Sequence, residues 1–347
     1  MFQRILVPLD GSSCAERALP VAARIARATH GSIVLARALP VPIEASWYSM
    51  NSPLLMEEAL DLELDEAERY LAEVVNRSEL AGIETKTQIL SSTPAPSILA
   101  ASHGQQTDLI VMCSRGTAGF KRWLTGSVTQ NVMRHSPIPV LALREKSNIS
   151  ACSYPDTSRP LHAFTTVVAL DGSPRAEEAL VPAAILTAAI VAPARGGLHL
   201  TRVVKVSTSS NKHGIDQTIR EQALYEAKCY LREVANRLFE GPVANLDLTI
   251  TWSVAMGEDV AKTLVRVAEH GEDARGVRVF GGYDMLAMAT HGRSGIERWM
   301  LGSVTEQLLT ATTLPMFVIH SSQPAVQPRT PADTASVEQP ASWVGLL

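Results

Sequence analysis

Cysteine is scarce in this sequence, with four in 347 residues. They are Cys14, Cys113, Cys152 and Cys229, and neither a Cys-x-x-Cys spacing nor a paired framework relates them. This distribution argues against a disulfide-stapled secreted domain, and the cysteine and histidine spacing indicates no zinc site. We therefore expect reduced thiols in a cytoplasmic protein.

Long apolar runs are missing too, because charged residues or prolines interrupt each hydrophobic stretch. No segment is therefore expected to span a bilayer. The sequence passes from Met1 directly into an apolar strand, without the h-region and cleavage site of a signal peptide. A formal net charge of −4 gives no overall attraction to nucleic acid or to an acidic membrane.

Several catalytic motifs are absent from the sequence. There is no Gly-x-x-x-x-Gly-Lys-Ser/Thr loop, which argues against a P-loop ATPase. No Gly-x-Gly-x-x-Gly follows the first expected strand, which argues against a dinucleotide enzyme, and there is no Gly-x-Ser-x-Gly elbow. We expect no catalytic residue, and at most weak hydrolysis of a nucleotide.

What the sequence does contain is an internal repeat. Residues 112–129 recur, with substitutions, as residues 288–305. In each copy an apolar run precedes a glycine-containing loop, and a helical pattern follows a Gly-Ser pair. Such a loop directs backbone N–H groups and a helix dipole at one small volume, which favours an anion such as phosphate. Fold and function should therefore be interpreted as a duplication.

The two copies also share the start of each half. A short apolar run ends in Asp-Gly-Ser at Asp10 and again at Asp171, which predicts a buried strand reaching a tight turn. Ser12 and Ser173 are suitable N-caps for the helix that follows, and Pro174 suits its first turn.

Strand and helix patterns alternate through both halves. The expected strands are residues 5–9, 32–38, 84–90, 109–112 and 139–143, then 167–170, 197–203, 247–254, 285–288 and 315–319. Long amphipathic helices around 66–77 and 226–237 carry Tyr70 and Tyr230, which we interpret as core residues. This alternation predicts an α/β protein with two doubly wound parallel sheets, whose ligands bind at the carboxyl ends of strands.

Composition and length suit two domains. With 46% hydrophobic and 19% charged residues, the chain can bury two cores. We expect a first domain at 1–146, a linker at 147–161, a second domain at 162–320 and a disordered tail at 321–347. The charged, glycine-containing stretch 270–282 has no counterpart in the first half and is interpreted as a surface loop.

These motifs carry a family resemblance: both halves resemble universal stress protein domains, and the chain resembles a tandem member. The family's nucleotide-binding loop has a glycine, two residues, a glycine, nine residues, a glycine and then Ser or Thr. The matching residues are Gly116, Gly126 and Ser127 in the first copy, and Gly292, Gly302 and Ser303 in the second. Cys113 and Ala289 stand where the first glycine belongs. The implied fold is Rossmann-like, of the adenine nucleotide alpha hydrolase type.

The resemblance also implies a site for ATP, with or without magnesium. Asp10 and Asp171 hold the position that lies near the adenosine, and Pro8 stands two residues before the first of them. The strand position that contacts adenine maps near Ala38 and Val203. The loop glycines and the final serines would hold the phosphates.

Some loop residues have two interpretations. Arg293 is either a cation facing phosphate or a solvated loop residue. Cys113 is either a redox sensor or a small buried residue at a strand end. Sulfur crowds a phosphate more than the methyl group of Ala289 does, so the second loop is ranked above the first, although Pro8 favours the first.

Three functions remain open at this point. The first is a stress-response sensor or regulator that binds ATP or a related adenine nucleotide. The second is a universal stress protein that binds no nucleotide and acts as a dimeric interaction module. The third is a slow ATPase. In each case the resemblance also implies that the halves pair internally through their last strands, and that the chain could pair again as a homodimer.

Overall fold

The protein is represented by a computed structural model that describes residues 1–39, 53–114, 127–145, 164–206, 215–271, 273–274, 277–278, 282–290 and 301–320. Strands and helices alternate through the first half. Its strands are β1 (Arg4–Leu9), β2 (Ser32–Ala38), β3 (Thr85–Leu90), β4 (Leu109–Ser114) and β5 (Val140–Arg144). Its helices are α1 (Ser13–Glu16), α2 (Ala18–Thr29), α4 (Pro53–Val75), α5 (Pro94–Gly104) and α6 (Ser127–His135), with a 3₁₀ turn at Ser78–Leu80.

The second half repeats this order of elements. Its main strands are β6 (Thr165–Leu170), β7 (Gly196–Lys205), β8 (Leu248–Gly257), β11 (Met285–Ala289) and β12 (Met316–Ile319). Its helices are α7 (Pro174–Glu177), α8 (Leu180–Val191), α9 (Ile215–Glu240), α10 (Val260–His270) and α11 (Ser303–Ala311).

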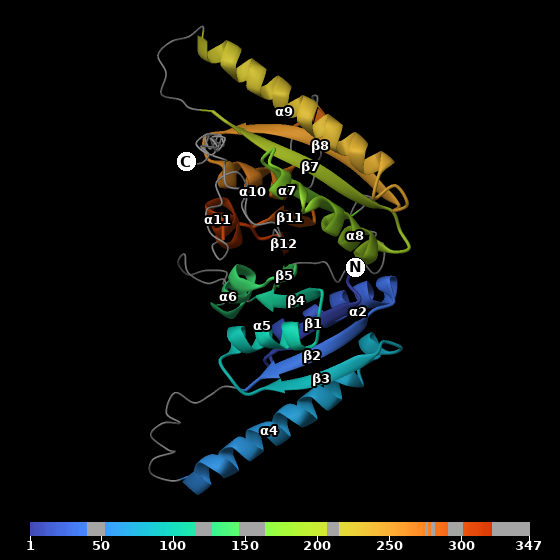
Figure 1. Ribbon diagram of the computed structural model, residues 1–347, viewed down its shortest axis with the longest axis vertical. Coiled ribbons are helices and arrows are strands. Elements are labelled where there is room, and N and C mark those ends of the chain that lie inside the picture. Colours follow the sequence, from blue (N-terminus) through green and yellow to red (C-terminus); the bar gives the residue numbers. More distant parts are fainter. Residues whose placement is uncertain are drawn as a thin grey trace, which may run out of the picture.

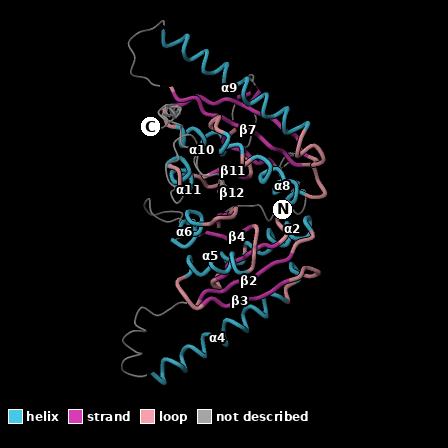
Figure 2. Tube along the Cα trace, in the orientation of Figure 1, coloured by secondary structure: helices cyan, strands magenta, loops and turns pink. Residues whose placement is uncertain are grey.

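All of these strands join one ten-stranded sheet, in the order β3-β2-β1-β4-β5-β12-β11-β6-β7-β8 (Figures 1 and 2). Within each half the strands are parallel, and the chain changes direction of winding between the first and the fourth strand. The expected pair of doubly wound α/β sheets is therefore confirmed. The two sheets are fused edge to edge, because β5 pairs with β12.

The β5–β12 pair is antiparallel and joins equivalent positions of the repeat. Leu141 pairs with Phe317, its counterpart in the second half. The flanking pairs, Val140 with Val318 and Ala142 with Met316, are related by the same exchange of halves. The halves are thus arranged around an internal pseudo-twofold axis, as in an isologous dimer.

Two arginines of the first half extend this junction beyond the sheet. The buried Arg144 at the end of β5 donates hydrogen bonds to Ser114 Oγ at 3.3 Å and to the carbonyl of Leu309 in α11. That carbonyl lies in the last turn of its helix, where carbonyl groups lack intrahelical partners. Arg134 in α6 pairs with Glu306 in α11 at 2.5 Å. Both contacts connect the first half to helix α11 of the second.

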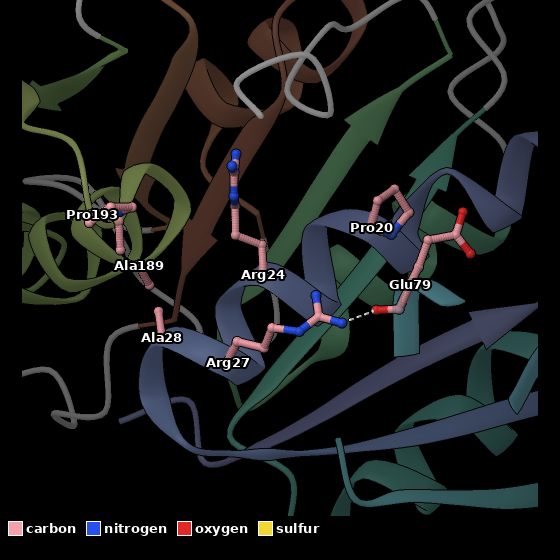
Figure 3. A pocket seen from close by; sticks show the side chains of 8 residues that line it. Pro20, Arg24, Arg27, Ala28, Glu79, Ala189 and Pro193 are labelled. Atoms are coloured by element: carbon pink, nitrogen blue, oxygen red, sulfur yellow. Dashed lines mark hydrogen bonds between the residues drawn. The ribbon is translucent and has the colours of Figure 1, made fainter. Parts of the chain in front are cut away.

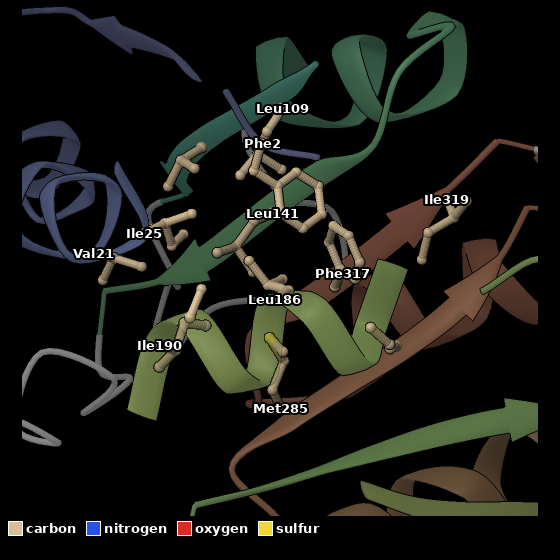
Figure 4. Close-up of a cluster of buried hydrophobic side chains, with 14 of the residues drawn as sticks. Phe2, Val21, Ile25, Leu109, Leu141, Leu186, Ile190, Met285, Phe317 and Ile319 are labelled. Carbon is tan, nitrogen blue, oxygen red and sulfur yellow. The ribbon is translucent and has the colours of Figure 1, made fainter. Parts of the chain in front are cut away.

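The hydrophobic core is divided by the faces of the sheet and not by the repeat. One cluster collects residues of α2, α4, α8 and α9 from both halves, and the other collects residues of α5, α6, α10 and α11. At the junction, Phe2 meets Phe317 edge to face, with ring centroids 6.1 Å apart (Figure 4). Ile25 of α2 and Leu186 of α8 lie in the same cluster. Each face of the sheet therefore has one continuous core.

Local sequence signals explain where the first helices begin. The Ala15 N–H donates to Ser12 Oγ and the Ala176 N–H donates to Ser173 Oγ, each at 3.2 Å, so both serines are N-caps as expected. Pro174 occupies the first turn of α7, where its missing N–H costs nothing.

The structure changes several expected boundaries. Helices α4 and α9 begin well before residues 66 and 226, and β7 and β8 are longer than expected. Stretch 270–282, interpreted above as a loop, contains a small antiparallel pair, β9 (Asp273–Ala274) with β10 (Val277–Arg278). The expected linker and tail lie outside the described residues. Among the helices that are described, none is long and apolar enough to cross a membrane.

One buried histidine departs from the apolar pattern of the strands. His199 in β7 is 5% exposed, and its two ring nitrogens lie 2.8 Å from Thr251 Oγ1 and 2.9 Å from Ser253 Oγ. Hydroxyl groups can donate or accept, so they satisfy the neutral ring. The ring also stacks on Tyr283. Burial lowers the pKa of His199 to about 4, so the side chain is neutral in the folded protein at pH 7.

We predict that Phe317→Ala destabilises the protein by about 3–5 kcal/mol, because the side chain is fully buried at the junction and its removal leaves a cavity. Urea unfolding measures the change. Phe239→Ala is the matched control, since Phe239 is 69% exposed and its truncation should change stability by less than about 0.5 kcal/mol. Equal effects of the two substitutions would contradict this account of the junction.

We also predict that His199 lowers the free energy of unfolding of the protein in acid. The unfolded state binds a proton near pH 6.5 and the folded state only near pH 4, so stability is lost as the pH falls between these values. From about pH 7 to pH 5 this contribution amounts to about 2 kcal/mol. His199→Gln keeps hydrogen-bonding groups but does not titrate. Between pH 7 and pH 5 the free energy of unfolding of this variant should therefore fall by about 2 kcal/mol less than that of the parent protein. If the free energies of unfolding of the parent and of His199→Gln had the same dependence on pH, the lowered pKa of His199 would be refuted.

Candidate functional site

The first and fourth strands of each half stop pairing before they end. The ladder between β1 and β4 covers Ile5 with Leu109 and Leu6 with Ile110, although β1 continues to Leu9 and β4 to Ser114. In the second half, the ladder between β6 and β11 likewise ends before Leu170 and Ala289. These are the points where the winding of each sheet reverses, the usual ligand position in α/β folds.

Asp10 and Asp171 each form the turn that follows the first strand. Asp10 Oδ1 accepts hydrogen bonds from the Ser12 N–H at 2.9 Å and from Ser12 Oγ at 2.5 Å. Asp171 Oδ1 accepts the same two bonds from Ser173, at 2.8 and 2.6 Å. The glycines between them have φ of +81° and +86°, a conformation that side chains disfavour. The Asp-Gly-Ser pattern is therefore a turn motif in its own right.

The second strand of each half brings a backbone carbonyl beside this turn. Leu9 pairs with Arg37, and Leu170 pairs with Arg202, so the aspartates that follow lie next to Ala38 and Val203. The Leu39 N–H donates to Leu90 in β3. Since successive residues of a parallel strand bond to opposite neighbours, the Ala38 carbonyl faces the β1 side, past the last residue of β1.

The same alternation holds in the second half. The Gly197 N–H donates to Phe164, on the β6 side, and Val203 lies an even number of residues further along β7. Its carbonyl therefore faces the β6 side, past Leu170. Pro8 is buried in β1 and pairs with Ala36, at a position where the ladder to β4 has already ended.

Gly302 closes the base of the second glycine loop. Its N–H donates to the carbonyl of Thr290 at 3.0 Å, so the two ends of the loop are joined. A Cβ on Gly302 would lie 2.7 Å from that carbonyl oxygen, which explains glycine here independently of any ligand. Ser303 is exposed at the first position of α11, next to this closure. The N–H groups of the first turn of α11 are thus at the end of β11.

The structure brings the predicted residues together as far as it describes them. Pro8, Asp10 and Ala38 meet at the carboxyl ends of β1 and β2. The carboxyl ends of β6, β7 and β11 hold the second group, Asp171, Val203, Gly302 and Ser303. For Ser127 the structure describes the backbone, at the start of α6. Gly116, Gly126, Gly292 and Arg293 lie outside the described residues.

A network beside Asp10 was missed by the sequence analysis. Tyr70 is partly buried, as a core residue would be, but its hydroxyl donates to Glu16 Oε1 at 2.9 Å. Arg77 pairs with the other oxygen of Glu16 at 2.9 Å, and Arg37 lies over the Tyr70 ring at 4.8 Å. The Arg77 hydrogen bond holds the pKa of Glu16 below its usual value. The network ties α4 to α1 and to the end of β2.

The second half repeats two contacts of this network. Arg237 pairs with Glu177 at 2.7 Å, and Arg202 lies over the Tyr230 ring at 5.3 Å. Burial raises the pKa of Tyr230, so its hydroxyl stays protonated at physiological pH. Interpreting Tyr70 and Tyr230 as plain core residues was therefore incomplete. The signal that could have found the network is the recurrence of Glu, Arg, Tyr and Arg at matching positions of both copies.

A groove elsewhere holds none of the predicted residues. It has a volume of about 490 Å³ and lies between α2 and α8 (Figure 3). Its lining residues are Pro20, Arg24, Arg27, Ala28, Glu79, Ala189, Ala192 and Pro193. Most of these residues are near the carboxyl ends of the two helices, whereas Asp10 precedes α1. Within the described part of the chain, no group of three or more His, Cys, Asp or Glu side chains could hold a metal ion.

Comparisons of sequence and of structure both relate this chain to universal stress proteins. The model of the Universal stress protein family matches residues 1–144 and again residues 164–320. A universal stress protein of Thermus aquaticus is 36% identical over 146 residues, which cover 42% of this chain and 100% of that protein. A universal stress protein of Mycobacterium tuberculosis is 25% identical over 265 residues, 74% of this chain and 78% of its own length.

A solved structure shares the arrangement of both halves. The crystal structure of a universal stress protein from Archaeoglobus fulgidus covers 92% of this chain and 99% of its own, with a TM-score of 0.59 and 20% identity. At that identity the likeness supports the fold alone. It extends over both halves, so the tandem arrangement is shared.

We predict that Gly302→Ala destabilises the protein by about 1–3 kcal/mol, because the new methyl group would overlap the Thr290 carbonyl and force the loop base apart. Differential scanning calorimetry without ligand measures the effect. Ser303→Ala is the control at the neighbouring exposed position, with an expected change of less than about 0.5 kcal/mol. An unchanged melting temperature for Gly302→Ala would show that the loop base does not need glycine.

Proposed function

The chain belongs to the universal stress protein family, and on that premise we propose that it binds an adenine nucleotide, with ATP as the main candidate, and acts as a stress-response regulator. The nucleotide would lie at the carboxyl ends of the strands, where the winding of each half reverses. Binding, and not catalysis, would be the functional event.

The observation that carries this proposal is the carbonyl beside each aspartate. In both halves a backbone carbonyl faces the space past the end of the first strand, beside the aspartate that follows that strand. Both groups accept hydrogen bonds. The adenine amino group and the ribose hydroxyls are donors, so the pairing is chemically complementary. From the described residues, Asp10 accepts two hydrogen bonds, both on Oδ1, and Oδ2 is the oxygen that we assign to such a donor.

The phosphates would lie toward the glycine loop. In the second half, the first turn of α11 begins at Ser303, directly after the loop closure at Gly302. Helix N-termini carry unsatisfied N–H groups and a positive dipole end, and both favour anions. The nine-residue helix α11 therefore suits a phosphate group at the same end of the sheet as Asp171 and Val203.

Regulation would follow from a shift between states of the protein. A nucleotide changes an equilibrium only as far as it binds one state better than another. The network of Glu16, Tyr70 and Arg77 connects helix α4 to helix α1, which begins at the Asp10 turn. A ligand at that turn would therefore act through α1 on groups that position the long outer helix α4, whose surface a partner could recognise.

An interaction module without nucleotide is the second candidate, and two observations favour it. The aspartates form turns through Oδ1, and Gly302 closes its loop, so both motifs have structural reasons to exist. The two candidates differ in the outcome of a single titration. A ligand that binds only the folded protein must raise its melting temperature.

We predict saturable ATP binding by calorimetry, with a matching rise in melting temperature. Asp10→Asn and Asp171→Asn should each weaken one site by about tenfold or more, because the amide replaces an accepting oxygen by a donor. An asparagine can retain the turn through its Oδ1, so stability should change little. Asp247→Asn is the control, since this exposed aspartate pairs with Arg195 before β8, at the other end of the strands.

The alternatives are separated in the same experiment. No heat and no melting shift at millimolar ATP would refute nucleotide binding and leave the interaction module. Phosphate release above a buffer blank, lost in Gly302→Val, would instead identify a slow ATPase. An unchanged affinity for ATP in the double variant Asp10→Asn/Asp171→Asn would place the nucleotide elsewhere and overturn the proposed site.

A further inference from the structure

We propose that Cys14 and Cys113 are a redox modification site, at which the two thiols join in a reversible disulfide in the first half only. The residues lie 99 positions apart in the chain. In the structure, their sulfur atoms are 3.4 Å apart, and the Cys14 thiol donates toward the Cys113 sulfur. Neither cysteine takes part in a disulfide in the reduced protein described here.

The geometry is close to that of a bond. A disulfide holds its sulfurs at 2.03–2.05 Å, so the two atoms must approach by roughly 1.4 Å. Cys14 lies in α1, a single turn of helix, and Cys113 lies at the penultimate position of β4. Both positions are near the end of an element, and β4 is no longer paired with β1 there. The proposal asks that a small movement of α1 and rotation of the two side chains close this gap.

One thiol of the pair is buried, and the other is partly exposed. Cys14 is 7% exposed, and Cys113 is partly exposed, so a small oxidant can reach the second thiol while larger proteins cannot easily reach the first. Burial raises the pKa of Cys113, which keeps its thiol protonated. Because the thiolate is the reactive form, the pair should oxidise slowly and respond to sustained exposure.

The duplication provides an internal comparison. The positions equivalent to Cys14 and Cys113 are Arg175 and Ala289, so the second half cannot form this bond. Cys113 also replaces the first glycine of the loop motif, and Cys14 follows the turn that Asp10 forms. The cysteines thus flank the candidate site of the first half, and the candidate site of the second half lacks this pair.

The chemistry requires a two-electron oxidant, for which we name a hydroperoxide, ROOH. One thiol is oxidised to a sulfenic acid while ROOH is reduced to the alcohol ROH. The second thiol attacks the sulfenic sulfur, the S–O bond breaks, the S–S bond forms and water leaves. In total, two thiols and ROOH give one disulfide, ROH and water. Reduction by an external dithiol reverses the step and oxidises that dithiol to its own disulfide.

The test is peptide mapping of the full-length folded protein after treatment with hydrogen peroxide. Trypsin leaves Cys14 in the peptide 5–17 and Cys113 in the peptide 87–115, so a joined product identifies the bond. We expect this product to form in the folded protein and to disappear with dithiothreitol. Cys14→Ser should abolish it, whereas Cys229→Ser, which removes a partly exposed thiol from α9, should not.

Two results would overturn the proposal. One is recovery of Cys14 and Cys113 only as separate thiols or as sulfinic and sulfonic acids, at every peroxide concentration that leaves the protein folded. The other is a joined product that forms equally well after denaturation and in the native protein, because a site built by the fold must favour the native pairing.

A consequence for ligand binding rests on the proposed function. Closing the sulfur gap draws α1 toward β4 and displaces the turn of Asp10. In the Asp171→Asn background, which leaves the first site, oxidation should weaken ATP binding by about tenfold, or about 1.4 kcal/mol. Cys14→Ser in that background should bind equally well before and after peroxide. Equal affinities in both redox states of the parent would refute this coupling.

The two proposals fail in distinguishable ways. If the unmodified protein binds no ATP, nucleotide binding is refuted, and the peptide map still decides whether the disulfide exists. If ATP binds and no joined peptide forms, the nucleotide site stands and the disulfide is refuted.

Discussion

The antiparallel pairing of β5 with β12 is the contact on which the rest of the structure depends. Because this register places Leu141 opposite its own counterpart, Phe317, it relates the halves by a pseudo-twofold axis. Helices α2 and α8 then lie on one face of the joined sheet and share one core. Arg134 and Arg144 reach the second half only because α6 and β5 border the same junction. A single strand pair thus determines how every other element of one half meets the other.

Within each half, the unpaired ends of two strands create the candidate site. β1 and β4 pair near their starts and not near their ends. The backbone groups at those ends are therefore not hydrogen-bonded between these two strands. The aspartate turns and the carbonyls of Ala38 and Val203 gather there because parallel strands end together. The same residues have structural duties, since Asp10 holds Ser12 and Gly302 closes a loop. A site of this kind adds function to atoms that the fold already requires.

Much of this could be predicted from the sequence, for physical reasons that act over short distances. Strand and helix periodicity, the serine caps and the Asp-Gly-Ser turns are local, so the order of elements and the fold class followed from them. The contact between Cys14 and Cys113 could not be found, because nothing in their spacing encodes a distance between elements. The Tyr70 network could not be predicted for the same reason, although its residue types recur at matching positions of both copies. The two short strands in 270–282 have no periodic pattern long enough to detect.

One chain carries both halves, and this has a genetic consequence. In a dimer of identical subunits, every substitution appears at both sites, so neither can change alone. Here Pro8 corresponds to Ala169 in the second half and Cys113 corresponds to Ala289, so the two sites differ in sequence although the strand pair between the halves relates equivalent positions. The duplication therefore allows the residues of one site to change while those of the other stay the same.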